Sequence, residues 1–145
     1  MLVTRLEVVE PMTEAYTRQT LHDYALDHIY AVAKSMGYRI AEINLAREHR
    51  TGPDIYVVNP VNGKGVVVES ELGHNITSKS YEKWEKRGRD YILQNKATAL
   101  IVLTETPRRA WKHFPKNLRK SKSFFVVGGS VFKDVIPSLL VKILQ

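Results

Sequence analysis

The chain has 145 residues, of which 43% are hydrophobic and 26% are charged, and it contains no cysteine. These values are typical of one folded domain spanning residues 1–145, and they exclude disulfides and cysteine-ligated zinc. The apolar runs are shorter than a membrane span and the N-terminus lacks a signal-peptide pattern, so we expect a cytoplasmic protein with no membrane partner.

The formal net charge of +7 is unevenly distributed along the chain. Residues 1–71 carry seven Lys and Arg against ten Asp and Glu, whereas residues 72–145 carry fifteen against five. A basic half of this kind is typical of proteins that bind a polyanion. The alternative is a generally basic protein without such a partner, because net charge bears on association rather than on fold.

The first half of the chain predicts a helix followed by three strands. After a weak strand pattern at residues 2–9, apolar side chains recur at spacings of three and four over residues 13–36, which is typical of an amphipathic helix. Thr13 is a plausible N-cap and Gly37 a natural stop. Asn62-Gly63 favours a tight hairpin turn. The predicted strands are residues 38–46, 55–58 and 66–72.

The second half continues with helices and strands in alternation. The apolar run at residues 97–105 is typical of a strand that is covered on both faces. The predicted elements are a helix at 78–95, this strand, a basic helix-and-loop region at 107–122, a strand at 123–129, and a helix at 131–144 that is interrupted or capped near Pro137. This order predicts a single α/β domain with a mixed sheet between helices.

Three carboxylates gather around the predicted hairpin, with Asp54 at its entrance and Glu69 and Glu71 near its exit. Side chains alternate along a strand, so Glu69 and Glu71 point to one face. Neighbouring strands lie about 4.8 Å apart, which brings Asp54 within reach of Glu69. Such carboxylates repel one another unless a hard cation such as Mg²⁺ neutralises them. The alternative is an α/β domain whose Glu69 and Glu71 face solvent at a strand end.

Pro53-Asp54 on the second predicted strand and Glu69-Ser70-Glu71 on the third resemble the PD-(D/E)XK nuclease superfamily, over roughly residues 13–105. The resemblance implies a restriction-endonuclease-like, three-layer α/β/α fold with a helix-strand-strand-strand-helix-strand core. It also implies that Asp54 and Glu69 bind Mg²⁺, for which Mn²⁺ substitutes.

Glu71 stands where this superfamily usually carries a lysine that helps to activate the attacking water. Some members with Glu at this position remain active, which makes Glu71 a second metal ligand or a general base. Other members place the lysine on the following helix, where Lys79 is our first candidate and Lys83 the second. An inactive protein that kept the fold is the remaining alternative.

The superfamily often adds an acid from the first helix to the metal site. At 100° per residue, Glu14 lies in line with the apolar stripe of the predicted helix, whereas Asp23 and Asp27 point towards solvent. We therefore choose Glu14 as a further metal ligand. His22 lies at the border of the stripe and is another candidate, although a histidine there is more often simply packed or hydrogen-bonded.

The region at 107–122 carries seven Lys and Arg and no acid. We interpret it, with the basic side chains of the preceding helix, as a surface that contacts DNA phosphates. We expect Trp111 and Phe114 to anchor this region to the core, with base stacking as the alternative. The predicted DNA-contacting residues are Lys83, Arg87, Arg108, Arg109, Lys112, Lys116, Arg119 and Lys120.

These features predict a metal-dependent DNA endonuclease that hydrolyses phosphodiester bonds with Mg²⁺-activated water. The alternative is a catalytically inactive nucleic-acid-binding protein on the same fold. The small size is compatible with a homodimer that cuts both strands. Neither basic element matches a base-reading motif, so the substrate stays open among a junction, a specific site, a flap and single strands.

Overall fold

The amphipathic first helix forms α1 (Glu14–Ser35) in a computed structural model that describes residues 14–44, 52–73, 75–112 and 123–145. α1 ends as predicted, because Gly37 adopts a φ of +82°, which glycine tolerates, and Tyr38 N–H donates to Ala33 O (2.9 Å). The strand pattern at residues 2–9 and the Thr13 cap lie outside the described residues.

Five strands form one mixed sheet in the order β1-β2-β3-β4-β5. β1, β2 and β3 are antiparallel neighbours, whereas β3, β4 and β5 run parallel. The turn between β2 and β3 closes with Asn59 N–H donating to Lys64 O, and Gly63 supplies its positive φ of +77°. The strands are β1 (Arg39–Ile43), β2 (Ile55–Val58), β3 (Gly65–Ser70), β4 (Ala99–Thr104) and β5 (Phe124–Gly128).

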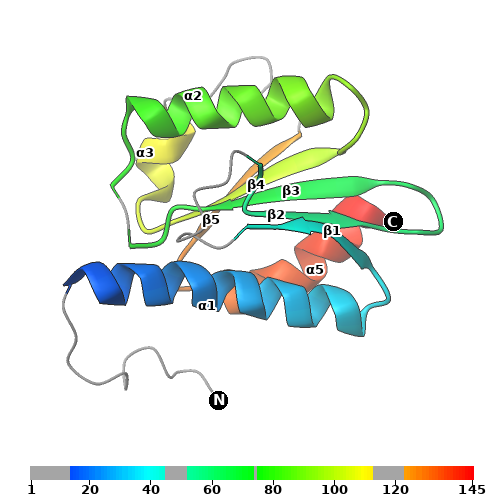
Figure 1. Cartoon of the computed structure of the whole chain (residues 1–145), viewed down its shortest axis with the longest axis horizontal. Coiled ribbons are helices and arrows are strands. Elements are labelled where there is room, and N and C mark those ends of the chain that lie inside the picture. Colours follow the sequence, from blue (N-terminus) through cyan, green and yellow to red (C-terminus); the bar gives the residue numbers. More distant parts are fainter. Residues whose placement is uncertain (1–13, 45–51, 74, 113–122) are drawn as a thin grey trace.

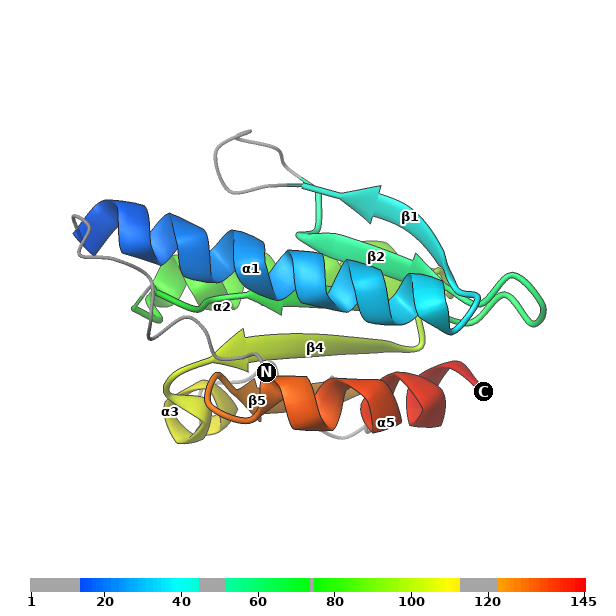
Figure 2. The same ribbon diagram turned by 90° about the horizontal axis from the view of Figure 1, so that it is seen from below.

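Helices cover both faces of this sheet (Figure 1). α1 and α5 (Phe132–Leu144) lie side by side on one face, as Figure 2 shows from below. The other face carries α2 (Ser78–Arg87), its π-helical continuation η3 (Gly88–Ile92), and α3 (Pro107–Lys112). The predicted α/β class, mixed sheet and element order are therefore confirmed.

Strand alternation divides the core into two apolar clusters. On the α1 and α5 face, Val66 and Val68 of β3 pack with Ile29 and Leu140. On the α2 and α3 face, the intervening Val67 packs with the fully buried Trp84 and with Ala110. The same alternation decides which helix layer each polar residue of β3 meets.

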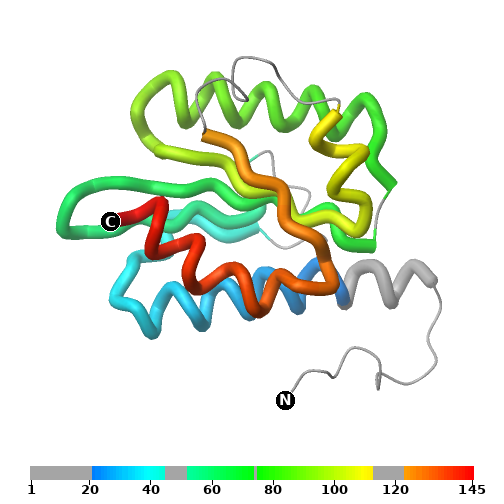
Figure 3. Tube along the Cα trace, turned by 180° about the vertical axis from the view of Figure 1, so that it is seen from behind, coloured from blue at the N-terminus to red at the C-terminus, as the bar shows by residue number. Residues whose placement is uncertain are grey.

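The turn between β2 and β3 lies beside the C-terminal end of α5, as the tube in Figure 3 shows from behind. Asn59 and Asn62 of the β2–β3 turn donate to Leu144 O at 2.8 and 3.0 Å. These bonds fix the end of α5 against the hairpin that carries the carboxylates.

The expected interruption at Pro137 is wrong, because α5 continues through it. Ile136 before the proline and Leu140 and Ile143 after it are buried on one face of the helix. Their burial offsets the one helical hydrogen bond that proline cannot donate. Among the described residues, no helix is long and apolar enough to cross a membrane.

Candidate functional site

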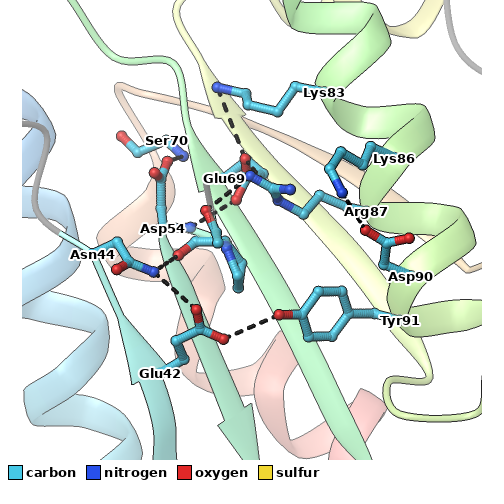
Figure 4. Close-up of polar contacts among 12 residues, drawn as sticks. Glu42, Asn44, Asp54, Glu69, Ser70, Lys83, Lys86, Arg87, Asp90 and Tyr91 are labelled. Atoms are coloured by element: carbon cyan, nitrogen blue, oxygen red, sulfur yellow. Dashed lines mark hydrogen bonds and ion pairs between the residues drawn. The ribbon is translucent and has the colours of Figure 1, made fainter. Parts of the chain in front are cut away.

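Asp54 and Glu69 meet at one end of β2 and β3 (Figure 4). The antiparallel register pairs Ile55 with Val68, so the preceding Asp54 lies beside Glu69. The backbone N–H of Asp54 donates to Glu69 Oε2 (2.8 Å), and the N–H of Ser70 donates to Asp54 Oδ2 (2.7 Å). The proximity of Asp54 to Glu69 that the sequence predicts is thus present.

Glu69 and Glu71 are buried rather than solvated. Glu69 is 0% exposed and Glu71 is 5% exposed, so the alternative in which both face solvent is wrong. Glu69 shares the parity of Val67 and points to the α2 layer. Burial, together with the negative charge of Asp54, raises the pKa of Glu69 to about 8, although nearby cations oppose this rise.

Lys83 of α2 is the lysine that meets these carboxylates. Its Nζ lies 2.6 Å from Glu71 Oε2 and 3.8 Å from Glu69 Oε1. Burial opposes the charge on Lys83, but the negative charges of Glu71, Glu69 and Asp54 outweigh it and raise the Lys83 pKa. The sequence placed Lys79 first, but Lys79 is exposed in the first turn of α2, about 6 Å further along the helix axis. The structure thus favours Lys83 over Lys79.

Arg87 follows Lys83 by one helical turn and also points inwards. It is only 5% exposed, its Nε lies 3.5 Å from Glu69 Oε1, and its Nη2 donates to Gly52 O (2.8 Å). Arg87 was expected on the exposed DNA-contacting surface, and this expectation is wrong. Its guanidinium instead ties α2 to the turn that precedes Asp54 and partly neutralises Glu69.

A second group of polar residues holds the turn at Gly52-Pro53. Asn44 Nδ2 donates to Pro53 O (2.6 Å) and to Glu42 Oε2 (3.2 Å), and Tyr91 OH donates to Glu42 Oε1 (3.0 Å). Burial and the hydrogen bond to Glu42 raise the pKa of Tyr91 to about 12, so its phenol stays a donor. Sequence reasoning missed these three residues, because their contacts join β1 to η3 across the sheet.

This turn borders a polar cavity of about 370 Å³ on the α2 side of the sheet. Because Arg87 lines it, the cavity adjoins the carboxylates. Its lining residues are Glu42, Gly52, Lys86, Arg87, Asp90, Tyr91, Gln94 and Lys96.

His22 reaches the carboxylates from the α1 side. Its Nε2 lies 3.2 Å from Asp54 Oδ2 and its Nδ1 lies 3.3 Å from Asp23 Oδ1. Burial lowers the pKa of His22, but the hydrogen bonds and charges of Asp54 and Asp23 outweigh it, so the net pKa is raised. The signal in the sequence is Leu26, an apolar residue one turn after His22 that is fully buried and shares its side of α1.

The acidic residues of α1 differ in exposure. Asp27 is exposed, as predicted, whereas Asp23 is partly buried and contacts His22 rather than pointing to solvent. Glu14 begins α1, but its side chain lies outside the described part of the chain. The choice of Glu14 as a metal ligand therefore stays a prediction.

α3 carries the described part of the predicted DNA-contacting surface. Arg108, Arg109 and Lys112 are all exposed. Trp111 packs edge-to-face on Phe124 (6.4 Å between ring centroids), as expected of an anchor, yet it is 45% exposed. Four residues expected in this region lie outside the described residues: Phe114, Lys116, Arg119 and Lys120.

The donor atoms fit a hard divalent cation in kind, because Asp54 and Glu69 are adjacent carboxylates. Among the described residues, however, no group of three or more acidic or histidine side chains is arranged to hold a metal ion. Lys83 pairs with Glu71 instead, Arg87 lies beside Glu69, and His22 contacts Asp54. A bound cation would therefore compete with these internal ion pairs.

Comparison of the chain with protein-family models, with curated proteins and with solved structures finds no match. The features that bear on function are therefore those of the residues themselves. They are the buried carboxylates, a lysine that contacts two of them, and an exposed basic helix.

Proposed function

We propose that this protein is a metal-dependent DNA endonuclease that hydrolyses phosphodiester bonds, on a fold of the restriction-endonuclease type. The observation that supports this most is the gathering of Asp54, Glu69 and Glu71 with Lys83 at one end of β2 and β3. Burying acids away from water is unfavourable, and packing alone does not require it. Functional sites are where such perturbed carboxylates concentrate.

Asp54 and Glu69 are the residues that would hold Mg²⁺, or Mn²⁺ in its place. The bound cation would supply Lewis-acid chemistry, activating water and stabilising charge on the phosphate. Lys83 takes the part of the lysine that the superfamily usually carries at the position of Glu71, and its ammonium orients the water and offsets developing negative charge. Glu71 holds Lys83 in position through their 2.6 Å ion pair.

DNA is the proposed substrate because the helix layer that covers Glu69 carries a group of exposed cations. Arg108, Arg109 and Lys112 of α3 are exposed, as is Lys79 of α2. Lys and Arg side chains of this kind bind phosphates without reading sequence. A homodimer would bring two such sites to the two strands of a duplex.

A specific observation favours a second candidate, a nucleic-acid-binding protein without catalysis. Lys83 and Arg87 already neutralise Glu71 and Glu69 within the protein. If these ion pairs are never displaced by a cation, the carboxylates serve the fold and the basic helices alone serve binding.

Cleavage of duplex, branched and single-stranded DNA in Mg²⁺, Mn²⁺ or EDTA separates the two candidates. Wild type should cut only with a divalent cation, and Asp54→Ala or Glu69→Ala should not cut. Under single-turnover conditions at saturating Mg²⁺, Lys83→Met should lower the rate by about 10²–10⁴-fold, the usual contribution of a positioned acid–base group. The matched control is Lys34→Met, which removes an exposed lysine from α1 in the other helix layer and should keep the wild-type rate. Metal-independent cleavage, or full activity of Glu69→Ala, would refute the proposal.

A further inference from the structure

One large aromatic side chain of α3, Trp111, is partly exposed beside a groove. Trp111 is 45% exposed, whereas Trp84 on the same side of the sheet is fully buried. The groove has a volume of about 410 Å³ and a predominantly apolar lining. We call it the Trp111 groove, and among the described residues it is lined by Pro107, Arg108, Trp111, Lys112 and Val126.

The Trp111 ring is supported from within. Its ring meets Phe124 edge-to-face at 6.4 Å and an interplanar angle of 74°, and Phe124 in turn meets Trp84 at 6.0 Å. The neighbouring Ala110 is fully buried in the same apolar cluster, which fixes α3 on the sheet. These contacts fix the position of the Trp111 ring on the sheet.

The Trp111 groove opens at the same end of the sheet as the carboxylates. β3 and β4 are parallel neighbours, and Glu71 N–H donates to Leu103 O (2.7 Å) near the end of β4. α3 begins at Pro107, three residues after β4 ends at Thr104 (Figures 1 and 3). A DNA strand bound at the carboxylates would therefore pass close to the Trp111 groove.

We propose that the Trp111 groove binds an unpaired base of single-stranded DNA by stacking on Trp111, with Arg108 and Lys112 on the adjacent phosphates. This rests on the proposed function, since it names the form of DNA that the endonuclease accepts: a single strand, or a duplex with a single-stranded tail. Apolar walls suit the flat face of a base, and exposed cations suit phosphates.

Other partners fit this chemistry less well. An intact duplex hides its base faces within the stack, so it offers nothing planar to Trp111. An acidic peptide would form ion pairs with Arg108 and Lys112, but its carboxylates offer no ring to stack on Trp111. The combination of one partly exposed indole and two flanking cations therefore favours an unpaired nucleotide.

The test is binding of oligo-dT measured in EDTA, where no metal-dependent cleavage interferes. Addition of oligo-dT should quench the fluorescence of Trp111, while the buried Trp84 keeps its emission. By anisotropy of a labelled oligo-dT, Trp111→Ala should raise Kd by about 5- to 150-fold, the range that base–aromatic stacking provides. Trp111→Phe should retain most of the affinity.

Tyr30→Ala is the matched control, because Tyr30 is 42% exposed on α1, in the opposite helix layer. It should bind oligo-dT like wild type. Blunt duplex should bind equally to wild type and Trp111→Ala, since only phosphate contacts hold it.

Two results would overturn the inference. One is wild-type oligo-dT affinity in Trp111→Ala; the other is a polyglutamate peptide that quenches Trp111 as strongly as oligo-dT at equal ionic strength. If Trp111→Ala fails to fold by circular dichroism, Trp111→Leu against Trp111→Phe makes the same comparison, because leucine fills space without stacking. A protein that binds oligo-dT through Trp111 but cuts no DNA with any metal would refute the endonuclease and leave this inference standing.

Discussion

The substitution Glu69→Gln should change how the free energy of unfolding depends on pH. Burial and the charge of Asp54 raise the pKa of Glu69 to about 8, against 4.5 for an ordinary glutamate. The folded protein therefore holds this proton more tightly than the unfolded chain does. The resulting stabilisation is fully present below pH 4.5 and is lost as the pH rises through about 8.

The difference between these two pKa values corresponds to about 5 kcal/mol of folding free energy, which is the largest loss expected in wild type. Glu69→Gln is nearly isosteric, stays neutral at every pH and can still accept the Asp54 N–H. The Glu69→Gln variant should therefore not lose this folding free energy as the pH rises. Relative to wild type, the variant should gain stability progressively from pH 5 to pH 9.

Urea denaturation in EDTA at intervals from pH 5 to pH 9, followed by circular dichroism, measures this difference. Both proteins keep His22 and Lys83, so the titration of these groups largely cancels in the comparison. The matched control is Glu82→Gln, which removes an exposed carboxylate from α2. Its stability should run parallel to wild type.

A stability difference between Glu69→Gln and wild type that stays constant within about 0.5 kcal/mol, the usual scatter of a surface substitution, would refute the reasoning. It would mean that Glu69 ionises in the folded protein as it does in water. The burial of this carboxylate would then carry no energetic consequence.

Three further outcomes are expected. Arg87→Met removes the guanidinium that faces Glu69 and donates to Gly52 O. Urea denaturation at pH 9, where Glu69 is ionised, should show a loss of about 3–5 kcal/mol, against a negligible loss for the exposed Arg89→Met. Gly52→Ala would place a Cβ against Glu42 Oε2 and displace its hydrogen bond from Asn44 Nδ2, costing about 1–2 kcal/mol in the same assay. Mg²⁺ binding should strengthen as pH rises to about 8 and release a proton, which calorimetry in two buffers of different ionisation enthalpy detects; buffer-independent heats would contradict this.

Local patterns in the sequence were sufficient for the order of elements and for the first two carboxylates. The spacing of apolar residues predicts α1 and α2, and the covered run at 97–105 predicts β4, because these periods follow from backbone geometry alone. Alternation along β3 and pairing across a hairpin bring Asp54 and Glu69 together for the same reason. Such inferences need no knowledge of how helices pack on the sheet.

Only the tertiary structure decided which helix residues reach those carboxylates. Lys79, Lys83 and Arg87 follow one another at intervals of four along one side of α2, so sequence spacing cannot rank them. The position of α2 along the sheet puts Lys83 and Arg87 beside Glu69 and leaves Lys79 exposed. The rotation of α1 likewise turns His22 towards Asp54, because the buried Leu26 draws that side of the helix onto the sheet. Both the slide and the rotation of a helix are set by packing between elements distant in sequence, which no local period contains.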